Sequence, residues 1–429
     1  MRKQKKLTNY FSRIFFNNPL LLATGFVAMF ILARVVHYEQ SLNFSFDQAD
    51  VSIRALELFQ NKELTFTGPV ASMNYQGHHL IQGVLIYYSQ LVFLIIGGFD
   101  PVKSSMAFML FSSMSAAALF YGVKKIANLR AAIAVTTIYC LLPFFINYSR
   151  FFWNVNFVLT LTPYFILTLG FYLQKRTLGK IFLAGLVLGI LIQFHYQVVL
   201  VMLAVLIFLV KFVKISFKEF LVWVLGVGVG MFPILVFELR SGFYNFQTAL
   251  AMLTHLSEIE VVSGGGILKS PHYFLGFMLL LLTMLVYLIR RRINNSHLVL
   301  LFLGLVVLFF VQIFPSSNTA FGMSKNWNYP SEKKVFETII NSGIASDYNV
   351  TNLVYDSRAT TIKYLLKRAD VQIDYDDYYQ NKFLFVVDQD ERFINNEAYE
   401  INNFRPFRIV DVWVINDVYK LFFLERISE

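Results

Sequence analysis

Long apolar runs separated by short polar segments dominate the first three quarters of the chain. Windows of about 17 to 22 apolar residues are long enough to cross the hydrocarbon core of a bilayer as helices. Ten such windows lie near residues 20–37, 79–97, 103–123, 131–147, 155–173, 181–196, 198–213, 219–237, 273–289 and 297–314. We therefore predict a polytopic α-helical membrane protein with nine or ten hydrophobic segments.

Basic residues gather at alternate boundaries of these windows, which is typical of cytoplasmic loops. The clusters lie at residues 2–13, 124–130, 175–180, 211–218 and 290–292. They share one side of the membrane only if segment 79–97 enters and returns or lies along the interface. The expected topology is nine crossings of the cytoplasmic membrane, with a cytoplasmic N-terminus, external loops at 38–78 and 238–272, and an external C-terminus.

The last part of the chain has a different pattern, with short amphipathic stretches. Helices are expected at 331–342, with Ser331 as the N-cap, and at 360–367. Strands are expected at 352–355, 383–387 and 410–415. The predicted organisation is a membrane domain, residues 1–314, followed by a small α/β extracytoplasmic domain, residues 315–429.

Composition and charge agree with a membrane protein. Hydrophobic residues make up 56% of the 429 residues and charged residues only 15%, against about 25% charged in soluble domains. The formal net charge of +10 divides into +14 for residues 1–314 and −4 for residues 315–429. Because the bases lie in short clusters between apolar runs, they favour membrane anchoring over nucleic-acid binding. The single cysteine, Cys140, excludes an internal disulfide.

Carboxylates are scarce before residue 315, and half of them lie in the first external loop. Ser45 and Gln48 have the spacing of a capping box, which predicts a helix running to about Phe59. This helix would lie along the membrane surface, with Asp47 and Asp50 on its polar face just above the lipid headgroups. A carboxylate there is placed to act as a general base. The alternative is an acidic first turn favoured by the helix dipole.

Other polar residues lie at predicted membrane boundaries. Arg150 could bind a phosphate, since a guanidinium matches phosphate oxygens, or be a lone interfacial arginine. His195 could donate to phosphate or acceptor, or be a satisfied interior histidine. Arg240 could be a ligand or pair locally with Glu238. The remaining candidate substrate or phosphate ligands are His78, His79, Asn154, Gln193 and Tyr196.

The order of these features resembles the membrane-embedded glycosyltransferases of the C superfamily, specifically the family 39-like group that includes dolichyl-phosphate-mannose-protein mannosyltransferases and aminoarabinose transferases. Four local motifs carry the resemblance, over about residues 10–245: Phe46-Asp47-Gln48-Ala49, the Gly77–Tyr88 segment, Ser149-Arg150-x-x-Trp153-Asn154, and Gly185-x-x-x-Gly189-x-x-x-Gln193-x-His195-Tyr196.

The resemblance implies an inverting transfer of one sugar from a polyprenyl-phosphate carrier to a lipid, glycan or protein acceptor on the outer face of the membrane. Asp47 would be the base, and Arg150 with His195 would stabilise the departing phosphate. Relatives often have Asp-Glu where this chain has Asp47-Gln48, so the second acid is unassigned and Asp50 is the candidate. No cofactor is implied, and no clear ligand set supports a divalent metal.

Two other classes of protein fit part of the pattern. A transporter or flippase of a lipid-linked saccharide would share the size and the basic loops, but such proteins usually show paired halves and ionisable residues at mid-membrane. A structural membrane subunit with a receptor-like tail explains the tail but not the acidic first loop.

Overall fold

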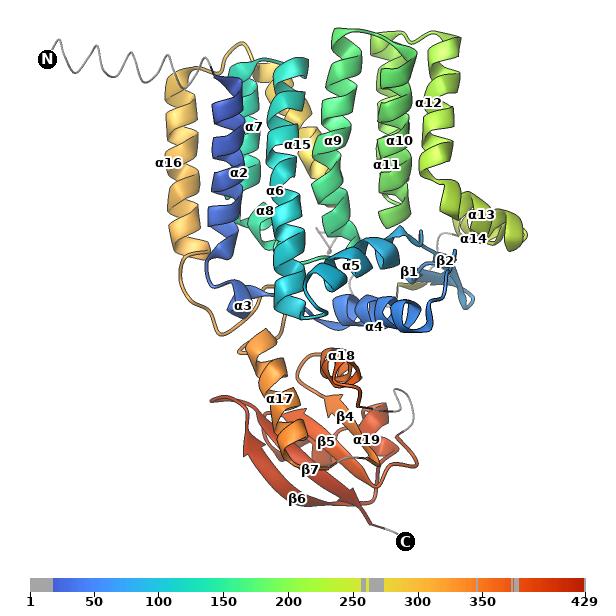
Figure 1. Ribbon diagram of the computed structural model, residues 1–429, viewed down its shortest axis with the longest axis vertical. Coiled ribbons are helices and arrows are strands. Elements are labelled where there is room, and N and C mark those ends of the chain that lie inside the picture. The colour runs from blue at the N-terminus through green and yellow to red at the C-terminus, as the bar shows by residue number, and fades with distance from the viewer. Residues whose placement is uncertain are drawn as a thin grey trace, which may run out of the picture. The chain divides into compact units, whose positions relative to one another are not determined.

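The computed structural model describes residues 18–255, 260–261, 274–344, 346–371, 373 and 378–427 (Figure 1). The basic cluster at 2–13 and most of residues 256–273 lie outside this described part. The chain forms two compact units. The first comprises Met1–Val36, Leu64–Ser89 and Ala107–Phe314, and the second comprises His37–Glu63, Gln90–Met106 and Pro315–Glu429.

The first unit is mainly a bundle of apolar helices. Its helices are α2 (Pro19–Val35), α7 (Leu129–Leu141), α8 (Pro143–Asn147), α9 (Asn154–Gln174), α10 (Leu178–Phe194), α11 (Val198–Phe208), the π-helix η1 (Leu209–Val213), α12 (Phe217–Gly230), α13 (Phe232–Arg240), α14 (Tyr244–Thr254), α15 (Leu275–Ile289) and α16 (Asn295–Gln312). Strands β1 (Val70–Tyr75), β2 (His78–Ile81) and β3 (Glu260–Val261) form an antiparallel sheet ordered β2-β1-β3. Helices α5 (Leu85–Ile96) and α6 (Pro101–Ile126) each have residues in both units.

Several helices have the length and composition of membrane spans. Among the described residues, α6, α9 and α16 qualify individually, and α12 with α13 qualifies as a bent pair. Six more apolar helices or helix pairs are shorter. The prediction of a mostly helical protein with several apolar helices able to span a membrane is therefore confirmed. Segment 79–97 folds as β2 followed by the 12-residue α5, which at about 18 Å is too short to cross 30 Å of hydrocarbon as one helix.

Helices α10 and α12 pack closely because each has glycines where the two backbones meet. A Cβ atom added at Gly189 would lie 2.2 Å from the carbonyl oxygen of Val227, and one at Gly226 would lie 2.3 Å from that of Phe182. Glycines spaced four residues apart allow this approach between membrane helices. Gly185 and Gly189, which carried part of the family resemblance, therefore have a packing role in this fold.

A buried arginine stabilises the break between α7 and α8. Pro143 has no N–H to donate to the carbonyl of Tyr139 four residues earlier. Arg34, which has no exposed surface, donates to that oxygen at 3.2 Å and to the carbonyl of Cys140 at 2.9 Å. Its Nε also donates to Oγ of Ser149. The guanidinium thus pairs main-chain acceptors that the helix break leaves open.

The second unit combines the acidic first loop with the C-terminal residues. Its helices include α3 (Tyr38–Ser41), α4 (Phe46–Asn61), α17 (Tyr329–Asn341), α18 (Thr360–Arg368), the 3-10 helix η5 (Glu391–Asn395) and α19 (Tyr399–Asn402). Its sheet contains β4 (Tyr348–Asn352), β5 (Phe383–Asp388), β6 (Phe407–Val414) and β7 (Lys420–Arg426). The strand order is β4-β5-β7-β6, with β4 and β5 parallel and the other pairs antiparallel.

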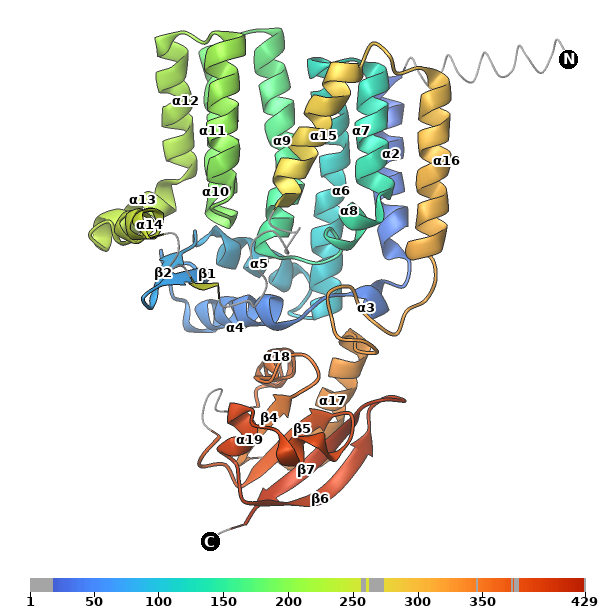
Figure 2. The same ribbon diagram turned by 180° about the vertical axis from the view of Figure 1, so that it is seen from behind.

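Buried side chains on both faces of the sheet form the core of the second unit. Val350, Phe385 and Leu421 face α17 and α18, and Leu384 and Phe422 face α19. Figure 2 shows helices on both sides of this sheet. The predicted small α/β fold of the tail is thus observed. Its extracytoplasmic location stays a prediction.

Some predicted details of the tail are wrong. The strand expected at 352–355 lies at Tyr348–Asn352, and β7 was not predicted. The N-cap of α17 is Asn328, whose side chain accepts from the N–H of Ser331, so the helix starts before Ser331. Pro330 in the first turn explains the earlier start, because proline is well tolerated there.

Candidate functional site

Helix α4 presents Asp47 in its first turn, as the sequence predicted. Gln48 Oε1 accepts from the main-chain N–H of Ser45 at 3.1 Å, which completes the predicted capping box. Ala49 and Leu56 are buried, whereas Asp47 and Asp50 are exposed on the opposite face. The amphipathic pattern therefore fixes which way the two carboxylates point.

Residues of the tail hold α4 in place within the second unit. Thr361 Oγ1, at the start of α18, donates to the carbonyl oxygen of Phe44 at 2.9 Å. At the other end of α4, Lys367 and Glu57 form an ion pair of 2.5 Å. The first loop, assigned from the sequence to the membrane domain, is thus part of the same compact unit as the tail.

The environment of Asp47 raises its pKa. The side chain keeps accessible surface, yet the protein packed around it limits its hydration, and this desolvation raises the pKa of Asp47 from 3.8 to about 6. The negative charges of Asp50 and Asp356 raise it further in the same direction. A carboxylate with a pKa near 6 is ionised at neutral pH and is a stronger base than an ordinary aspartate.

Asp356 is a neighbour that the sequence did not reveal. Its two carboxylate oxygens accept from the main-chain N–H groups of Arg358, at 3.2 Å, and Thr360, at 2.8 Å, so it is held at the start of α18. The adjacent Tyr355 lies near Ser45, the N-cap of α4, and near Asp47, because both side chains influence the pKa of Tyr355. Residues 355 and 356 therefore belong to the surroundings of Asp47, and no local motif could have indicated this.

Glu332 is a second acid that the sequence did not reveal. It is 2% exposed, and its Oε1 accepts from Trp327 Nε1 at 2.7 Å and from Asn352 Nδ2 at 3.2 Å. Burial raises the pKa of Glu332 to about 8, and the charge of Asp356 adds to this. Its other oxygen, Oε2, has no hydrogen-bond partner within the described residues. Glu332 is therefore a neutral acid at pH 7 in the folded protein.

Arg150 lies inside the first unit and contacts main-chain oxygens. It is 3% exposed, and it donates from Nε to the carbonyl of Arg34 at 3.2 Å and from Nη2 to that of Val36 at 3.0 Å. These bonds tie the segment after α8 to the end of α2. The structure thus gives Arg150 a structural role, and its predicted phosphate contact stays a prediction.

The residues that end α10 form a polar group beside strand β2. The hydroxyl of Tyr196 donates to the carbonyl of Ile81, and Asn245 Nδ2 on α14 donates to both of these oxygens, at 3.1 and 3.0 Å. Gln193 Nε2 donates to Gly230 O at 2.6 Å. Tyr196 therefore stabilises the contact of the α10 end with β2, and Gln193 stabilises the contact of α10 with α12.

The other predicted ligands also lie in the first unit. Asn154 donates to Gln82 Oε1 at 3.0 Å. His78 is exposed and lies 6.3 Å from the Tyr244 ring, while Nδ1 of His79 is 3.1 Å from Ala71 O. Arg240 is exposed and stacks over the ring of Phe66 at 5.1 Å. The predicted local pair of Glu238 and Arg240 is not among the ion pairs of the described residues.

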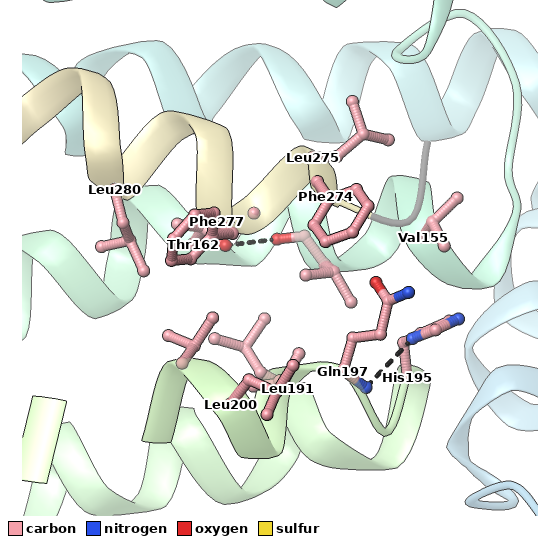
Figure 3. A pocket seen from close by; sticks show the side chains of 14 residues that line it. Val155, Thr162, Leu191, His195, Gln197, Leu200, Phe274, Leu275, Phe277 and Leu280 are labelled. Carbon is pink, nitrogen blue, oxygen red and sulfur yellow. Dashed lines mark hydrogen bonds between the residues drawn. The ribbon is translucent and has the colours of Figure 1, made fainter. Parts of the chain in front are cut away.

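An apolar pocket of about 210 Å³ lies between α9, α11 and α15 (Figure 3). Its walls are aliphatic and aromatic, and His195 and Gln197 form its polar end. Figure 3 shows the N–H of Gln197 donating to Nδ1 of His195, a bond of 3.2 Å. The buried Oε1 of Gln197 has no hydrogen-bond partner within the described part of the chain. The pocket therefore suits a long apolar group with a polar end.

The predicted site residues are thus divided between the two units. Asp47 and Asp50 belong to the second unit, and the predicted ligands from His78 to Arg240 belong to the first. In the part of the chain that the structure describes, no three histidine, cysteine or acidic side chains are grouped as metal ligands would be. Comparison with known proteins gives no match to a family model, a curated protein or a solved structure.

Proposed function

We propose that this protein is a membrane glycosyltransferase that moves one sugar from a polyprenyl-phosphate carrier to an acceptor on the outer face of the cytoplasmic membrane. The observation that carries the proposal is Asp47, an exposed carboxylate with a pKa of about 6, held in the first turn of a capped helix. The apolar helices of the first unit and the resemblance of the local motifs support it.

Asp47 would act as the general base in this reaction. A carboxylate whose pKa lies close to the working pH is deprotonated and still accepts a proton efficiently. It would remove the proton of the acceptor hydroxyl as that oxygen attacks the anomeric carbon. The bond from that carbon to the carrier phosphate would break, and the phosphate would leave with the bonding electrons. Because phosphate is a good leaving group, positioning and electrostatics would suffice on its side.

The apolar pocket of the first unit supports a lipid-linked donor. Its walls carry almost no polar surface apart from the end formed by His195 and Gln197. A polyprenyl chain would contact the walls, and the phosphate would lie near His195, which is the role predicted for this residue. The acceptor class, whether lipid, glycan or protein, stays open in the proposal.

A transporter or flippase of a lipid-linked saccharide is the second candidate. The observation that favours it is the break between α12 and α13, where the helix pair bends by 72°. Broken helices often form substrate sites in transporters. Against it, the buried Arg34 within α2 is occupied by protein acceptors, so it has no evident role on a transport path.

Radiolabelled polyprenyl-phosphate sugars, added to membranes containing the protein, provide the test. Asp47→Asn should reduce transfer by about 10²-fold or more, with unchanged expression. Glu63→Gln is the matched control, because Glu63 is an exposed acid of the same loop, 3.9 Å from Arg54. Full activity of Asp47→Asn would exclude Asp47 as the base. Movement of an intact lipid-linked sugar without transfer would favour the transporter.

A further inference from the structure

Helices α13 and α14 each expose several large apolar side chains. On α13, Phe232 and Leu239 are 60% and 70% exposed, and on α14, Phe246 and Leu253 are 66% and 68% exposed. These residues are spaced three, four or seven positions apart within each helix, together with Leu235 and Leu250, so they form one continuous row on each helix.

The opposite faces of the same two helices are buried and carry three polar residues beside the apolar Ile234 and Met252. Glu238 on α13 is 8% exposed, and Asn245 and Thr248 on α14 are 7% and 6% exposed. Glu238 Oε2 accepts from the N–H of Phe246 at 3.2 Å, which joins the two helices. Large apolar side chains outside, with a carboxylate, an amide and a hydroxyl inside, are not the arrangement expected of two helices in water.

The exposed row continues the surface of α12. Leu225 and Val229 are 60% and 50% exposed on α12, and Phe232 follows them across the bend. Since α13 is inclined by 72° to α12, a membrane-crossing α12 places α13 close to the plane of the bilayer. Figures 1 and 2 show α13 and α14 lying across the end of α12.

We propose that α13 and α14 lie in the lipid–water boundary, with their apolar rows in contact with the acyl chains. Such placement explains why six large apolar side chains of these two helices are exposed. The inference rests on the membrane embedding that the proposed function assumes, and it adds a defined depth for one part of the chain.

The depth of α14 in the membrane also sets the depth of Tyr196 and strand β2. Asn245 on α14 bonds to Tyr196, next to His195, and to the main chain of Ile81 in β2. A helix at the boundary therefore holds Tyr196 and strand β2 at the level of the lipid headgroups. A phosphate carried by a lipid would lie at that same level.

Nitroxide labels at single introduced cysteines test the inference on the whole chain in phospholipid vesicles. The native Cys140 is fully buried and should remain unlabelled in the folded parent. The test positions are Phe246→Cys and Leu250→Cys on the exposed row. Val307→Cys on α16 is the lipid control, and Lys333→Cys on the tail is the aqueous control; both of these residues are exposed.

Two collision rates are measured for each label. One is with oxygen, which concentrates in lipid, and the other is with a water-soluble nickel chelate. Labels at 246 and 250 should show the same oxygen and nickel collision rates as the label at 307. Their nickel collision rates should be lower than that of the label at 333. If the label at 307 is lipid-exposed while the labels at 246 and 250 behave like the aqueous control at 333, the placement of α13 and α14 is overturned. The membrane embedding of the protein is then retained. Labels at 246 and 250 that neither reagent reaches would indicate a protein cover, such as a second copy, and would also overturn it. Aqueous behaviour at 307 would overturn the embedding itself.

Discussion

The side chain of Arg150 donates to the carbonyl oxygen of Arg34 at 3.2 Å, while the side chain of Arg34 donates to the residue before Arg150, Ser149. Each arginine thus fixes the other one's segment through main-chain or hydroxyl oxygens. Both guanidinium groups are almost completely buried. Because carbonyl oxygens without a donor are costly in an apolar interior, this pair should be important for the stability of the first unit.

Arg34→Met is expected to destabilise the protein by roughly 3 kcal/mol or more, since several charge-assisted hydrogen bonds are lost and their acceptors stay buried. Cys140 offers a direct measurement, because it is buried in the native fold and reacts with a thiol dye once the fold opens. The midpoint of thermal dye labelling in detergent should fall. Arg54→Met is the control, as Arg54 is 42% exposed and makes surface ion pairs of little energetic worth. Equal midpoints for the two variants would contradict the structural role of Arg34.

The contact between α10 and α12 leads to a second prediction. Gly226→Ala should destabilise the first unit by roughly 1–3 kcal/mol, because the added methyl would overlap the backbone of α10. Gly228→Ala, on the same helix, is the matched control, since no atom lies within 4 Å of a Cβ there. The control should be neutral or stabilised by up to about 1 kcal/mol through helix propensity. The dye-labelling midpoint distinguishes the two. A stable Gly226→Ala variant would mean that the helices are farther apart.

A third prediction concerns the pH dependence of the proposed transfer. Activity should rise with pH through about 6, as Asp47 ionises. Asp356→Asn removes a negative charge near Asp47, so its pKa should fall and the acid limb of the pH–rate profile should move to lower pH. Asp417→Asn, in the same unit, should leave the profile unchanged. An unmoved acid limb in Asp356→Asn would show that Asp356 does not influence the base.

The raised pKa of Asp47 should also make the stability of the second unit depend on pH. The folded pKa of Asp47, about 6, lies above its ordinary value of 3.8. Between these two values the unfolded chain releases the proton first, so stability falls as pH rises across this interval. Asp47→Asn should remove that part of the decline. Unfolding of the second unit, followed by tryptophan fluorescence at pH 4 and pH 7, measures it.

Glu332 should affect stability in the same direction but at higher pH. Its folded pKa of about 8 exceeds the ordinary value of 4.5. The contribution of Glu332 to stability is therefore greatest below pH 4.5 and decreases as the pH rises to about 8. Glu332→Gln keeps a neutral side chain and should stabilise the second unit at pH 7 by up to about 3 kcal/mol. Fluorescence of Trp327, whose Nε1 donates to Glu332, reports the unfolding. Glu337→Gln, exposed on the same helix, should have no such effect, and a lower stability of Glu332→Gln would contradict the assigned neutral state.

Much of the fold follows from local patterns. The capping box of Ser45 and Gln48, the buried face of α4 and the apolar helices were predicted, because residues three and four apart share a helix face. Strand β4 was placed four residues late because Asn349 and Asn352 are of a type depleted in strands, whereas the fold buries both. The strand β7 was missed for another reason, since Leu421–Leu424 is a continuous buried apolar run without alternation.

By itself, the sequence determined the apolar helices, the α/β tail and the position of Asp47 on the polar face of its helix, because hydropathy and periodicity act over a few residues. Only the tertiary structure decided what surrounds Asp47. Thr361 and Phe44 are 317 positions apart, yet their hydrogen bond brings the start of α18, with Asp356, to the start of α4. Such contacts depend on the packing of whole elements, and no local pattern encodes them. The same packing also decided that Arg150 donates to main-chain oxygens at the end of α2, a contact that no local pattern indicated.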